Sequence, residues 1–247
     1  DKYLDGENMF ITGPGGTGKT RLIKLIAEHA RLNKKRCQVC AMTGCAAVLL
    51  ECKAKTFHSW AGIGLATDAE GKIIDRIMKS RMKKKKWYET DILIVDEVSM
   101  MSVKIFELFY NISRKIKGIG NMFGGMQVIF SGDFYQLPPI DNDFCFISKY
   151  WMSGFPITIC LTKIFRQTDK AWIKMLNQIR EGYMSKTTYN TLKQYVNRPD
   201  DSFTTPTRLL PRRHSVDKIT NSELNKIDNE LVTYKIKKPD GSDLTPK

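Results

Sequence analysis

The apolar residues of this chain fall into short continuous runs, separated by longer segments in which they recur every three or four positions. A continuous apolar run of four to eight residues is typical of a strand that is buried on both faces of a parallel sheet. One example is DILIVDE, residues 91–97, which ends in two acidic residues. The same pattern predicts strands at 8–12, 37–42, 126–130 and 157–161, and weaker patterns predict strands at 207–211 and 230–236.

Helical spacing occupies most of the chain between these runs. In residues 21–32 the apolar positions are 22, 23, 25, 26 and 30, which places them along one side of a helix. Residues 55–65 lack this spacing and are predicted to be loop and turn. Strands that alternate with helices indicate an α/β fold with a parallel sheet. Further helices are predicted at 71–86, 102–116, 169–180, 186–196 and 215–227, and 43–50 is predicted to be a loop that enters a helix.

Composition narrows the classes of partner. The 247 residues are 42% hydrophobic and carry 40 Lys and Arg against 26 Asp and Glu, which gives a net charge of +14. An excess of this size attracts polyanions, nucleic acid above all. No apolar run is long enough to cross a bilayer and no signal peptide is visible, so we expect no membrane partner.

Six cysteines are spread along the chain, and two of them, Cys37 and Cys40, have CxxC spacing. A zinc site would require a second CxxC or a pair of histidines, and neither is present. The alternative, reduced thiols in or near a strand, is favoured. It indicates an intracellular reducing compartment.

The segment GPGGTGKT, residues 13–20, matches the phosphate-loop pattern GxxxxGK[ST] between a predicted strand and a predicted helix. Glycines let the backbone N–H groups wrap a phosphate closely, and the helix adds its positive end. Lys19 would reach the β- and γ-phosphates, and the Thr20 hydroxyl would bind Mg²⁺. The expected nucleotide-binding residues are Gly13, Gly15, Gly16, Thr17, Gly18, Lys19 and Thr20.

Two further segments supply polar groups where buried strands end. Asp96 ends the 91–97 strand, where a carboxylate that binds Mg²⁺ belongs, and Glu97 could orient and deprotonate an attacking water. The stretch SGDFYQLPPI, residues 131–140, carries Gln136 to the same edge of the sheet. Its amide could hydrogen-bond the γ-phosphate or the water. Spacing alone leaves a γ-phosphate sensor and a plain turn equally open.

Taken together, these motifs resemble the superfamily 1B DNA helicases of the PIF type, with the Dda and RecD helicases as nearer relatives. The resemblance is carried by GPGGTGKT, AMTGCAAVLL with KTFHSW, LIVDEVSM, FGGMQVIFSGDFYQLPPI and LTKIFRQTDKAWIKMLNQIREG. It implies a RecA-like ATP-hydrolysing motor that moves 5′ to 3′ on single-stranded DNA and separates duplexes in replication, repair or recombination. It therefore implies ATP and Mg²⁺ as cofactors and a nucleus or other DNA-containing site as the location.

The resemblance also implies roles for particular side chains. Lys19, Glu97 and Gln136 would be catalytic, with Gln136 as the γ-phosphate sensor. Arg166, in FRQ, would be the arginine finger, which neutralises charge on the transferring phosphoryl group. Without the resemblance, Arg166 would be interpreted as a surface salt bridge.

Contacts with nucleic acid are implied at 43–44, 57–60 and 207–214. Thr43 and Gly44 could bind a phosphate oxygen, and Lys83–Lys86 is a candidate for the duplex-separating insertion, although a solvated face is the commoner role of such a run. Phe57 or Trp60 could stack on a base, although a place in the core is the favoured interpretation of both. The remaining expected contacts are His58, Ser59, Thr207, Arg208 and His214.

The same resemblance predicts the domain organisation. Residues 1–160 would form the first RecA-like motor domain, with a small inserted segment around 60–90, and 161–247 would begin a second, truncated RecA-like domain. The family's downstream motifs do not occur before Lys247. Two alternatives therefore stay open: a nucleic-acid-binding module with an incomplete ATPase, and a P-loop enzyme of another class. A monomer is expected, and RNA is not excluded as a partner.

Overall fold

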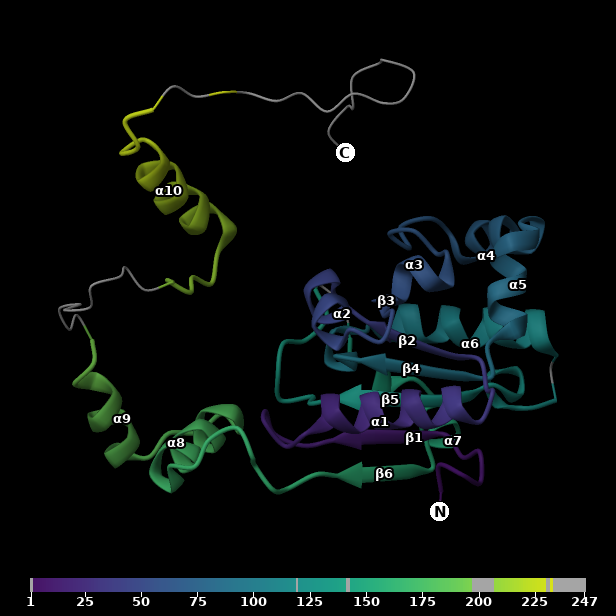
Figure 1. The fold of residues 1–247 in the computed structure, drawn as a ribbon, viewed down its shortest axis with the longest axis horizontal. Helices are drawn as coiled ribbons and strands as arrows, with labels where there is room; N and C mark the ends of the chain where they lie inside the picture. The colour runs from purple at the N-terminus through teal and green to yellow at the C-terminus, as the bar shows by residue number, and fades with distance from the viewer. Residues whose placement is uncertain (1, 119, 141–142, 197–206, 230–231, 233–247) are drawn as a thin grey trace. The chain divides into compact units, whose positions relative to one another are not determined.

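Six parallel strands form one sheet in the computed structural model, which describes residues 2–118, 120–140, 143–196, 207–229 and 232. The strand order across the sheet is β3-β2-β4-β5-β1-β6 (Figure 1). The α/β fold with a parallel sheet is thereby confirmed. The strands are β1 (Met9–Thr12), β2 (Cys37–Ala41), β3 (Lys55–Thr56), β4 (Ile92–Asp96), β5 (Gln127–Gly132) and β6 (Ile157–Cys160).

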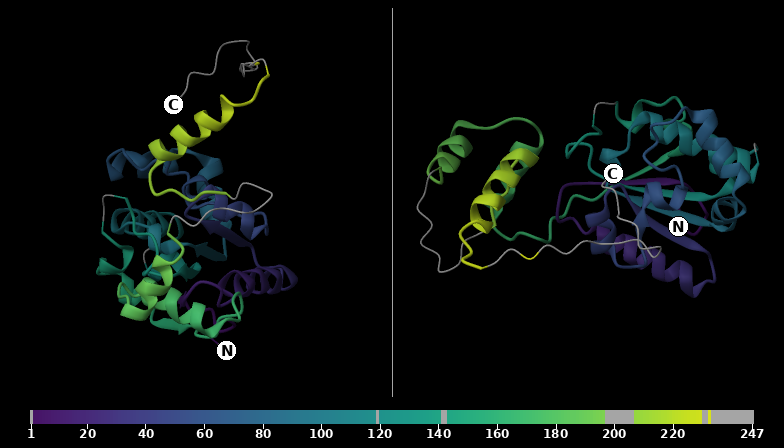
Figure 2. Two further views of the ribbon diagram at one scale, coloured as in Figure 1. Left: turned by 90° about the vertical axis from the view of Figure 1, so that its left-hand side faces the viewer. Right: turned by 90° about the horizontal axis from the view of Figure 1, so that it is seen from above.

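Alternating side chains of the strands feed two separate apolar cores. Phe10 points to one face of the sheet, and its neighbours Met9 and Ile11 point to the other. Helices α1 and α2 cover the face of Met9 and Ile11, while α3 to α7 cover the face of Phe10 (Figures 1 and 2). The bounds are α1 (Lys19–Leu32), α2 (Gly44–Leu50), α3 (Phe57–Ala61), α4 (Glu70–Lys79), α5 (Arg81–Glu89), α6 (Val103–Lys117) and α7 (Trp151–Gly154), with 3₁₀ turns at η1 (Val98–Met100), η2 (Met122–Gly125) and η3 (Cys145–Ile147).

The segment α3–α5 differs from the sequence-based prediction in two ways. Residues 55–65 were predicted to be loop and turn but contain β3 and α3, because the Thr56 hydroxyl caps the helix by accepting from the Ser59 N–H at 3.3 Å. The single helix predicted at 71–86 is two helices. Ser80 interrupts it with an extended backbone, and its hydroxyl accepts from the Lys83 N–H at 3.4 Å.

An aromatic cluster fixes this segment to the sheet-covering helix α6. Trp60 packs against Trp87 with ring centroids 4.7 Å apart, and Phe57 meets Phe109 of α6 edge to face at 5.6 Å. The Trp87 indole N–H donates to the Ala61 carbonyl at 3.0 Å, so the buried ring has its polar atom satisfied. The segment α3–α5 is therefore part of the apolar core on the Phe10 face of the sheet and not a loosely attached loop.

Two compact units divide the chain between Leu192 and Lys193. The first unit continues beyond β6 through α8 (Lys170–Arg180) into α9 (Lys186–Lys193). The Asp169 carboxylate begins α8 by accepting from the Ala171 N–H at 2.8 Å and the Trp172 N–H at 3.1 Å.

The second unit contains α10 (Arg213–Leu224), close to the helix predicted at 215–227. The strand predicted at 207–211 is wrong, because these residues, which the structure describes, are not in a strand. The strand predicted at 230–236 lies outside the described residues except at position 232. None of the helices in the described part of the chain is long and apolar enough to cross a bilayer.

Candidate nucleotide-binding site

Parallel strands bring their carboxyl ends to one edge of the sheet, and the predicted phosphate-binding groups follow these ends. Thr12, the last residue of β1, pairs in register with Gly132 of β5 on one side and Cys160 of β6 on the other. The loops that leave β1, β5 and β6 therefore begin next to one another. Asp96 and Glu97 stand where β4, the neighbour of β5, ends.

The loop 13–20 is packed so closely that two of its glycines cannot be replaced without movement. A Cβ on Gly13 would lie 2.2 Å from the Leu161 carbonyl oxygen, and a Cβ on Gly16 would lie 2.6 Å from the Arg166 Cβ. Both glycines also have positive φ, at 142° and 81°. The Phe165 N–H donates to the Gly16 carbonyl at 2.8 Å. The segment after β6 is thus fixed directly against the phosphate loop.

Internal hydrogen bonds hold the same loop in a curved shape. The Thr17 hydroxyl donates to the Pro14 carbonyl at 2.9 Å. The Lys19 ammonium donates to the carbonyls of Gly13 and Pro14, the second at 3.0 Å. Burial lowers the pKa of Lys19, while the carboxylates of Asp133, Asp96 and Glu97 act in the opposite direction.

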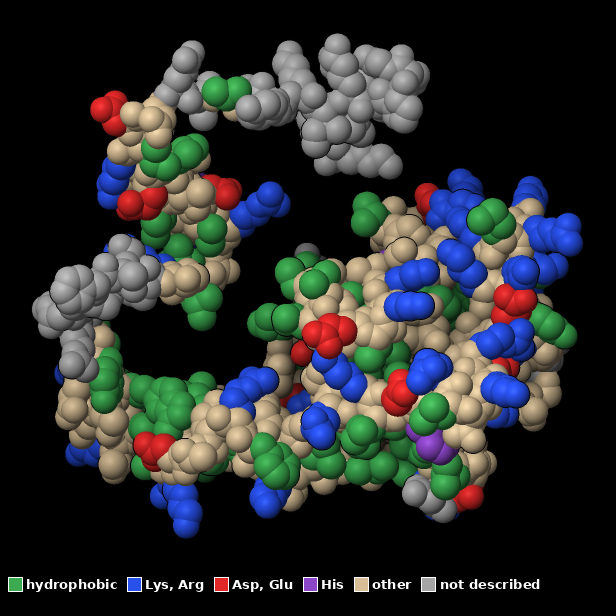
Figure 3. All heavy atoms as spheres, in the orientation of Figure 1, with side chains coloured by type: hydrophobic (Ala, Val, Ile, Leu, Met, Phe, Trp, Pro, Cys, Tyr) green, Lys and Arg blue, Asp and Glu red, His purple; other side chains and the backbone are tan. Residues whose placement is uncertain are grey.

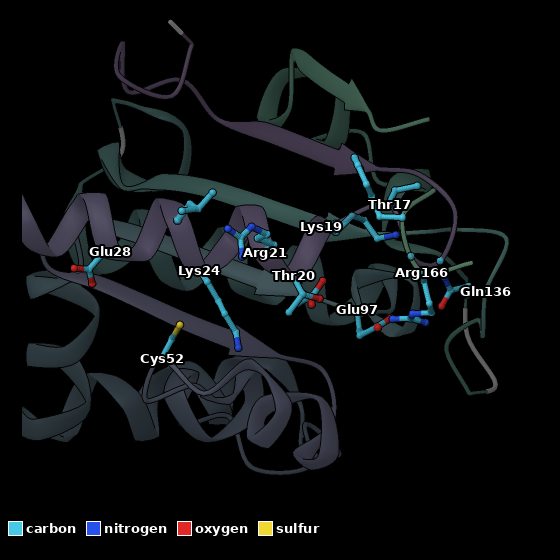
Figure 4. A pocket seen from close by; sticks show the side chains of 16 residues that line it. Thr17, Lys19, Thr20, Arg21, Lys24, Glu28, Cys52, Glu97, Gln136 and Arg166 are labelled. Carbon is cyan, nitrogen blue, oxygen red and sulfur yellow. The ribbon is translucent and has the colours of Figure 1, made fainter. Parts of the chain in front are cut away.

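A cavity of about 960 Å³ opens in front of this loop (Figure 4). The structure brings together there all four side chains predicted to be catalytic, which come from four different segments of the chain. The part of the cavity wall that follows the exposed side of α1 was not predicted from the sequence, because those positions carry no motif. The lining residues are Gly15, Gly16, Thr17, Gly18, Lys19, Thr20, Arg21, Lys24, Leu25, Glu28, Cys52, Asp96, Glu97, Gln136, Phe165 and Arg166.

The two acidic residues of the cavity differ in their surroundings. Burial raises the pKa of Asp96, with the Lys19 ammonium among the groups that oppose it. Burial also raises the pKa of Glu97, and the nearby charges of Asp96 and Asp133 add to the effect. Glu97 has a left-handed backbone, φ 58° and ψ 39°, which is unfavourable for a residue with a side chain and recurs at active sites. A raised pKa and a constrained backbone suit a group that accepts a proton.

The donor set fits Mg²⁺ only together with a phosphate. The Thr20 hydroxyl and the Asp96 carboxylate line the same cavity and are oxygen ligands of the kind that Mg²⁺ prefers. Within the described residues, no group of three or more His, Cys, Asp or Glu side chains could hold a metal ion by itself. Phosphate oxygens and water would have to complete the coordination.

Gln136 is held by a buried ion pair that sequence analysis did not find. Its side-chain amide N–H donates to the Asp133 carboxylate at 3.3 Å, and Arg180 donates to both oxygens of that carboxylate at 2.7 Å. Arg180 ends α8, and its guanidinium also lies 4.4 Å from the centre of the Tyr135 ring. The partners are 47 residues apart, so spacing could not link them.

Arg166 lines the cavity beside the phosphate loop. No ion pair of Arg166 is formed among the described residues. The alternative interpretation of Arg166 as a surface salt bridge is therefore not supported. Figure 4 shows its side chain in the wall of the cavity that Glu97 and Gln136 also line.

The residues predicted to contact single-stranded DNA differ in how far they are exposed. Thr43 caps α2 by accepting from the Ala46 N–H at 3.2 Å, and Gly44 is exposed. Ser59 is exposed and His58 half-buried, where burial lowers the pKa of its imidazole. Phe57 is 0% exposed. We therefore withdraw Phe57 as a stacking residue, because the core encloses its ring.

The other candidates lie on surfaces that the nucleotide cavity does not include. Thr207, Arg208 and His214 are exposed residues of the second unit. Lys83–Lys86 belong to α5, and Figure 3 shows Lys and Arg side chains gathered over α4 and α5. Lys83 is partly committed to the fold, since its ammonium donates to the Gly62 carbonyl at 3.3 Å.

Comparison with known proteins decides the family. A family model described as PIF1-like helicase matches residues 2–190. The chain belongs to the PIF1-like helicase family. An ATP-dependent DNA helicase PIF1 of Emericella nidulans is 34% identical in an alignment 241 residues long that covers 93% of this chain and 32% of that protein. The resemblance expected from the motifs is confirmed.

Solved PIF1-like helicases share the fold. The crystal structure of Pif1 helicase from Candida albicans superposes with a TM-score of 0.87 at 33% identity, over 95% of this chain and 54% of that one. The structure of Pif1 helicase from Bacteroides in complex with ADP-AlF3 and ssDNA gives 0.75 at 30% identity, over 92% and 55%. The RecA-like sheet is thereby confirmed. The chain spans about a third of the first relative and about half of the solved structures.

Proposed function

We propose that the chain is the ATP-hydrolysing motor part of a DNA helicase that moves 5′ to 3′ on single-stranded DNA. One observation carries the proposal: Lys19, Glu97, Gln136 and Arg166, from four separate segments, line one cavity at the carboxyl edge of the sheet. Nucleotides bind at this edge in open α/β sheets. The relatives named ATP-dependent DNA helicases, and the Pif1 complex with ADP-AlF3 and ssDNA, support the choice of reaction and partner.

In the proposed reaction, water attacks the γ-phosphorus of ATP and the bond to the β,γ-bridging oxygen breaks, which yields ADP and inorganic phosphate. Glu97 takes the proton of the water. Lys19 and Arg166 neutralise charge on the phosphoryl oxygens, and Gln136 hydrogen-bonds the γ-phosphate or the water. Mg²⁺, held by Thr20 and Asp96, would neutralise charge on the β- and γ-oxygens.

The proposed strand contacts are Thr43, Gly44, His58 and Ser59 in the first unit and Thr207, Arg208 and His214 in the second. Thr43 follows β2, so it belongs to the same edge of the sheet as the cavity. We assign 1–160 to the first motor domain, with the inserted segment around 60–90, and 161–247 to the beginning of the second.

The test is the ATPase rate of this chain and of a longer parent protein, measured with and without single-stranded oligonucleotides of DNA and of RNA. We expect DNA to stimulate the parent, and Lys19→Ala to abolish turnover in both. Arg31→Ala, which removes an exposed basic residue from the last turn of the same helix outside the cavity, is the matched control for lost charge. An ATPase rate of the longer parent that is the same with and without DNA would contradict the motor function.

The net charge of +14 supports a second candidate, a nucleic-acid-binding module without a working ATPase. DNA binding that weakens steeply with salt, without measurable turnover in the longer parent, would select it.

A further inference from the structure

A buried ion pair stands directly behind the proposed γ-phosphate sensor. The Asp133 side chain is 0% exposed and that of Arg180 19% exposed, and two parallel hydrogen bonds of 2.7 Å join them. Such a fork is the strong form of an Arg–carboxylate contact. Burial raises the pKa of Asp133, but the hydrogen bonds from Arg180 and Gln136 more than offset this and hold it below its usual range. Asp133 is therefore kept as a carboxylate.

An ionised carboxylate decides which end of the Gln136 amide faces it. A carboxylate only accepts hydrogen bonds, so the Gln136 Nε2 must point toward Asp133, and it does so at 3.3 Å. The second hydrogen of Nε2 is then left to donate to a phosphate oxygen in the cavity, whereas Oε1 can only accept, as from a water. Backbone contacts reinforce the arrangement, because the Gln136 N–H donates to the Asp133 carbonyl at 2.8 Å and the Tyr135 N–H to its carboxylate at 3.3 Å.

We propose that Arg180 is a positioning residue for ATP hydrolysis: it orients Asp133, and through Asp133 it fixes the rotamer and the amide orientation of Gln136. The inference depends on the proposed function, because it deepens the role given there to Gln136. Arg180 does not line the cavity that holds Lys19 and Glu97. It lines a neighbouring cleft of about 320 Å³ with Asp133, Tyr135 and Gln136, and the wall of that cleft also includes Gly15 and Arg166.

The pair also ties α8 to the sheet. Asp133 directly follows β5, and Arg180 is the last residue of α8, whose preceding segment carries Arg166. A change in the position of α8 would therefore turn the sensor. Without Arg180, the buried Asp133 would favour its protonated form, which can donate to Oε1 and reverse the Gln136 amide.

A second Arg–Asp fork in the same unit provides the control. Arg36 donates to both oxygens of Asp91 at 3.3 and 3.2 Å, where β2 and β4 begin, at the edge of the sheet away from the cavity. The two forks join the same groups, although the Arg36 and Asp91 side chains are more exposed, at 57% and 34%, so Arg36→Gln shows what the loss of an Arg–Asp pair does away from the cavity. Only the Asp133–Arg180 fork contacts Gln136.

The test measures the dissociation constants of ADP and of a non-hydrolysable ATP analogue, and their ratio, by fluorescence titration of this chain. We expect Arg180→Gln to leave the affinity for ADP within about twofold and to weaken the analogue about ten- to hundredfold, the effect of one charge-assisted hydrogen bond. Arg180→Lys, which keeps the charge, should restore part of the ratio. Arg36→Gln should leave the ratio unchanged.

A double-mutant cycle makes the proposal specific. In a Gln136→Ala background, Arg180→Gln should have no further effect on the ratio, because the residue through which it acts is gone. Equal losses in both backgrounds would overturn the inference. The inference would also be overturned if Gln136→Ala lowered the preference for the analogue over ADP and Arg180→Gln left it unchanged. An unchanged ratio in Gln136→Ala itself would instead refute the sensor role in the proposed function.

A variant with an unpaired buried charge can fail to fold. The double variant Asp133→Asn with Arg180→Gln leaves no such charge, and circular dichroism checks that it is folded. We expect it to lose the discrimination as Arg180→Gln does. In the longer parent, the same variants should lower kcat and raise KM for ATP in step with the weaker binding of the analogue, whereas a merely structural defect would reduce the active fraction and ADP binding together.

Discussion

Gly16→Ala tests whether the phosphate loop positions Arg166. Gly16 has φ 81°, and a left-handed backbone costs a residue with a side chain about 1–2 kcal/mol. The added Cβ would lie 2.6 Å from the Arg166 Cβ, about 0.8 Å short of the 3.4 Å at which ordinary contact begins. Because that Cβ is rigidly attached to the backbone, the segment that carries Arg166 must move.

Two magnitudes follow from this geometry. The free energy of unfolding should fall by about 1–3 kcal/mol, in the range of substitutions at a constrained backbone position. Displacement of a catalytic group by about 1 Å can cost about 100-fold in rate, so kcat for ATP should fall by that order. Urea denaturation measures the first quantity, and steady-state ATPase assays of the longer parent with DNA measure the second.

Gly15→Ala is the matched control for stability. Gly15 is the preceding residue of the same loop, its φ is not in the left-handed region, and nothing lies within 4 Å of its added Cβ. Its substitution should change the free energy of unfolding by less than about 0.5 kcal/mol. Equal stabilities of the two variants, or full turnover by Gly16→Ala, would refute the argument that this contact sets the place of Arg166.

Three other predictions follow from the site and the core. Arg166→Ala should bind ATP normally but lower kcat by about 10³- to 10⁵-fold, the contribution of an arginine finger, and an equal loss in binding would contradict that role. Burial raises the pKa of Glu97, so the acid-side decrease in kcat should begin at a higher pH than it would for an ordinary glutamate, whose pKa is about 4.3. Glu97→Gln should abolish turnover at every pH. Trp87→Ala should lower the free energy of unfolding by about 3–5 kcal/mol in urea denaturation, whereas Tyr88→Ala, at a position 66% exposed, should change it little.

The core strands and the phosphate loop could be predicted because their signals are local. Residues 91–97 form an uninterrupted apolar run, and the structure has β4 there. The pattern GxxxxGK[ST] fixes Lys19 and Thr20 by spacing alone, since adjacent residues of one loop serve one phosphate chain. Short amphipathic pieces gave weaker signals. The helix at 71–86 was predicted as continuous because the break at Ser80 depends on a single capping hydroxyl.

The contacts that set the orientation of the site could not be predicted in the same way. Gly16 meets Arg166 and Asp133 meets Arg180 across 150 and 47 residues. Neither contact has a spacing rule, because each depends on how the segment after β6 returns to the sheet edge. Phe57 illustrates the opposite case: its type permits base stacking, and only the surrounding Trp60 and Phe109 show that it belongs to the core.

The segment between β6 and the end of α8 is thus attached to the sheet edge at two points with different consequences. Its contact with Gly16 positions Arg166, a cation of the cavity, whereas Arg180 acts on Gln136 through Asp133. Disturbing the first contact should therefore lower kcat and spare the preference for ATP over ADP. Disturbing the second should lower that preference as well, because the amide N–H that donates to the γ-phosphate is turned. If both variants lost the same property to the same extent, the two contacts would act as one structural support, and separate positioning of Arg166 and Gln136 would be wrong.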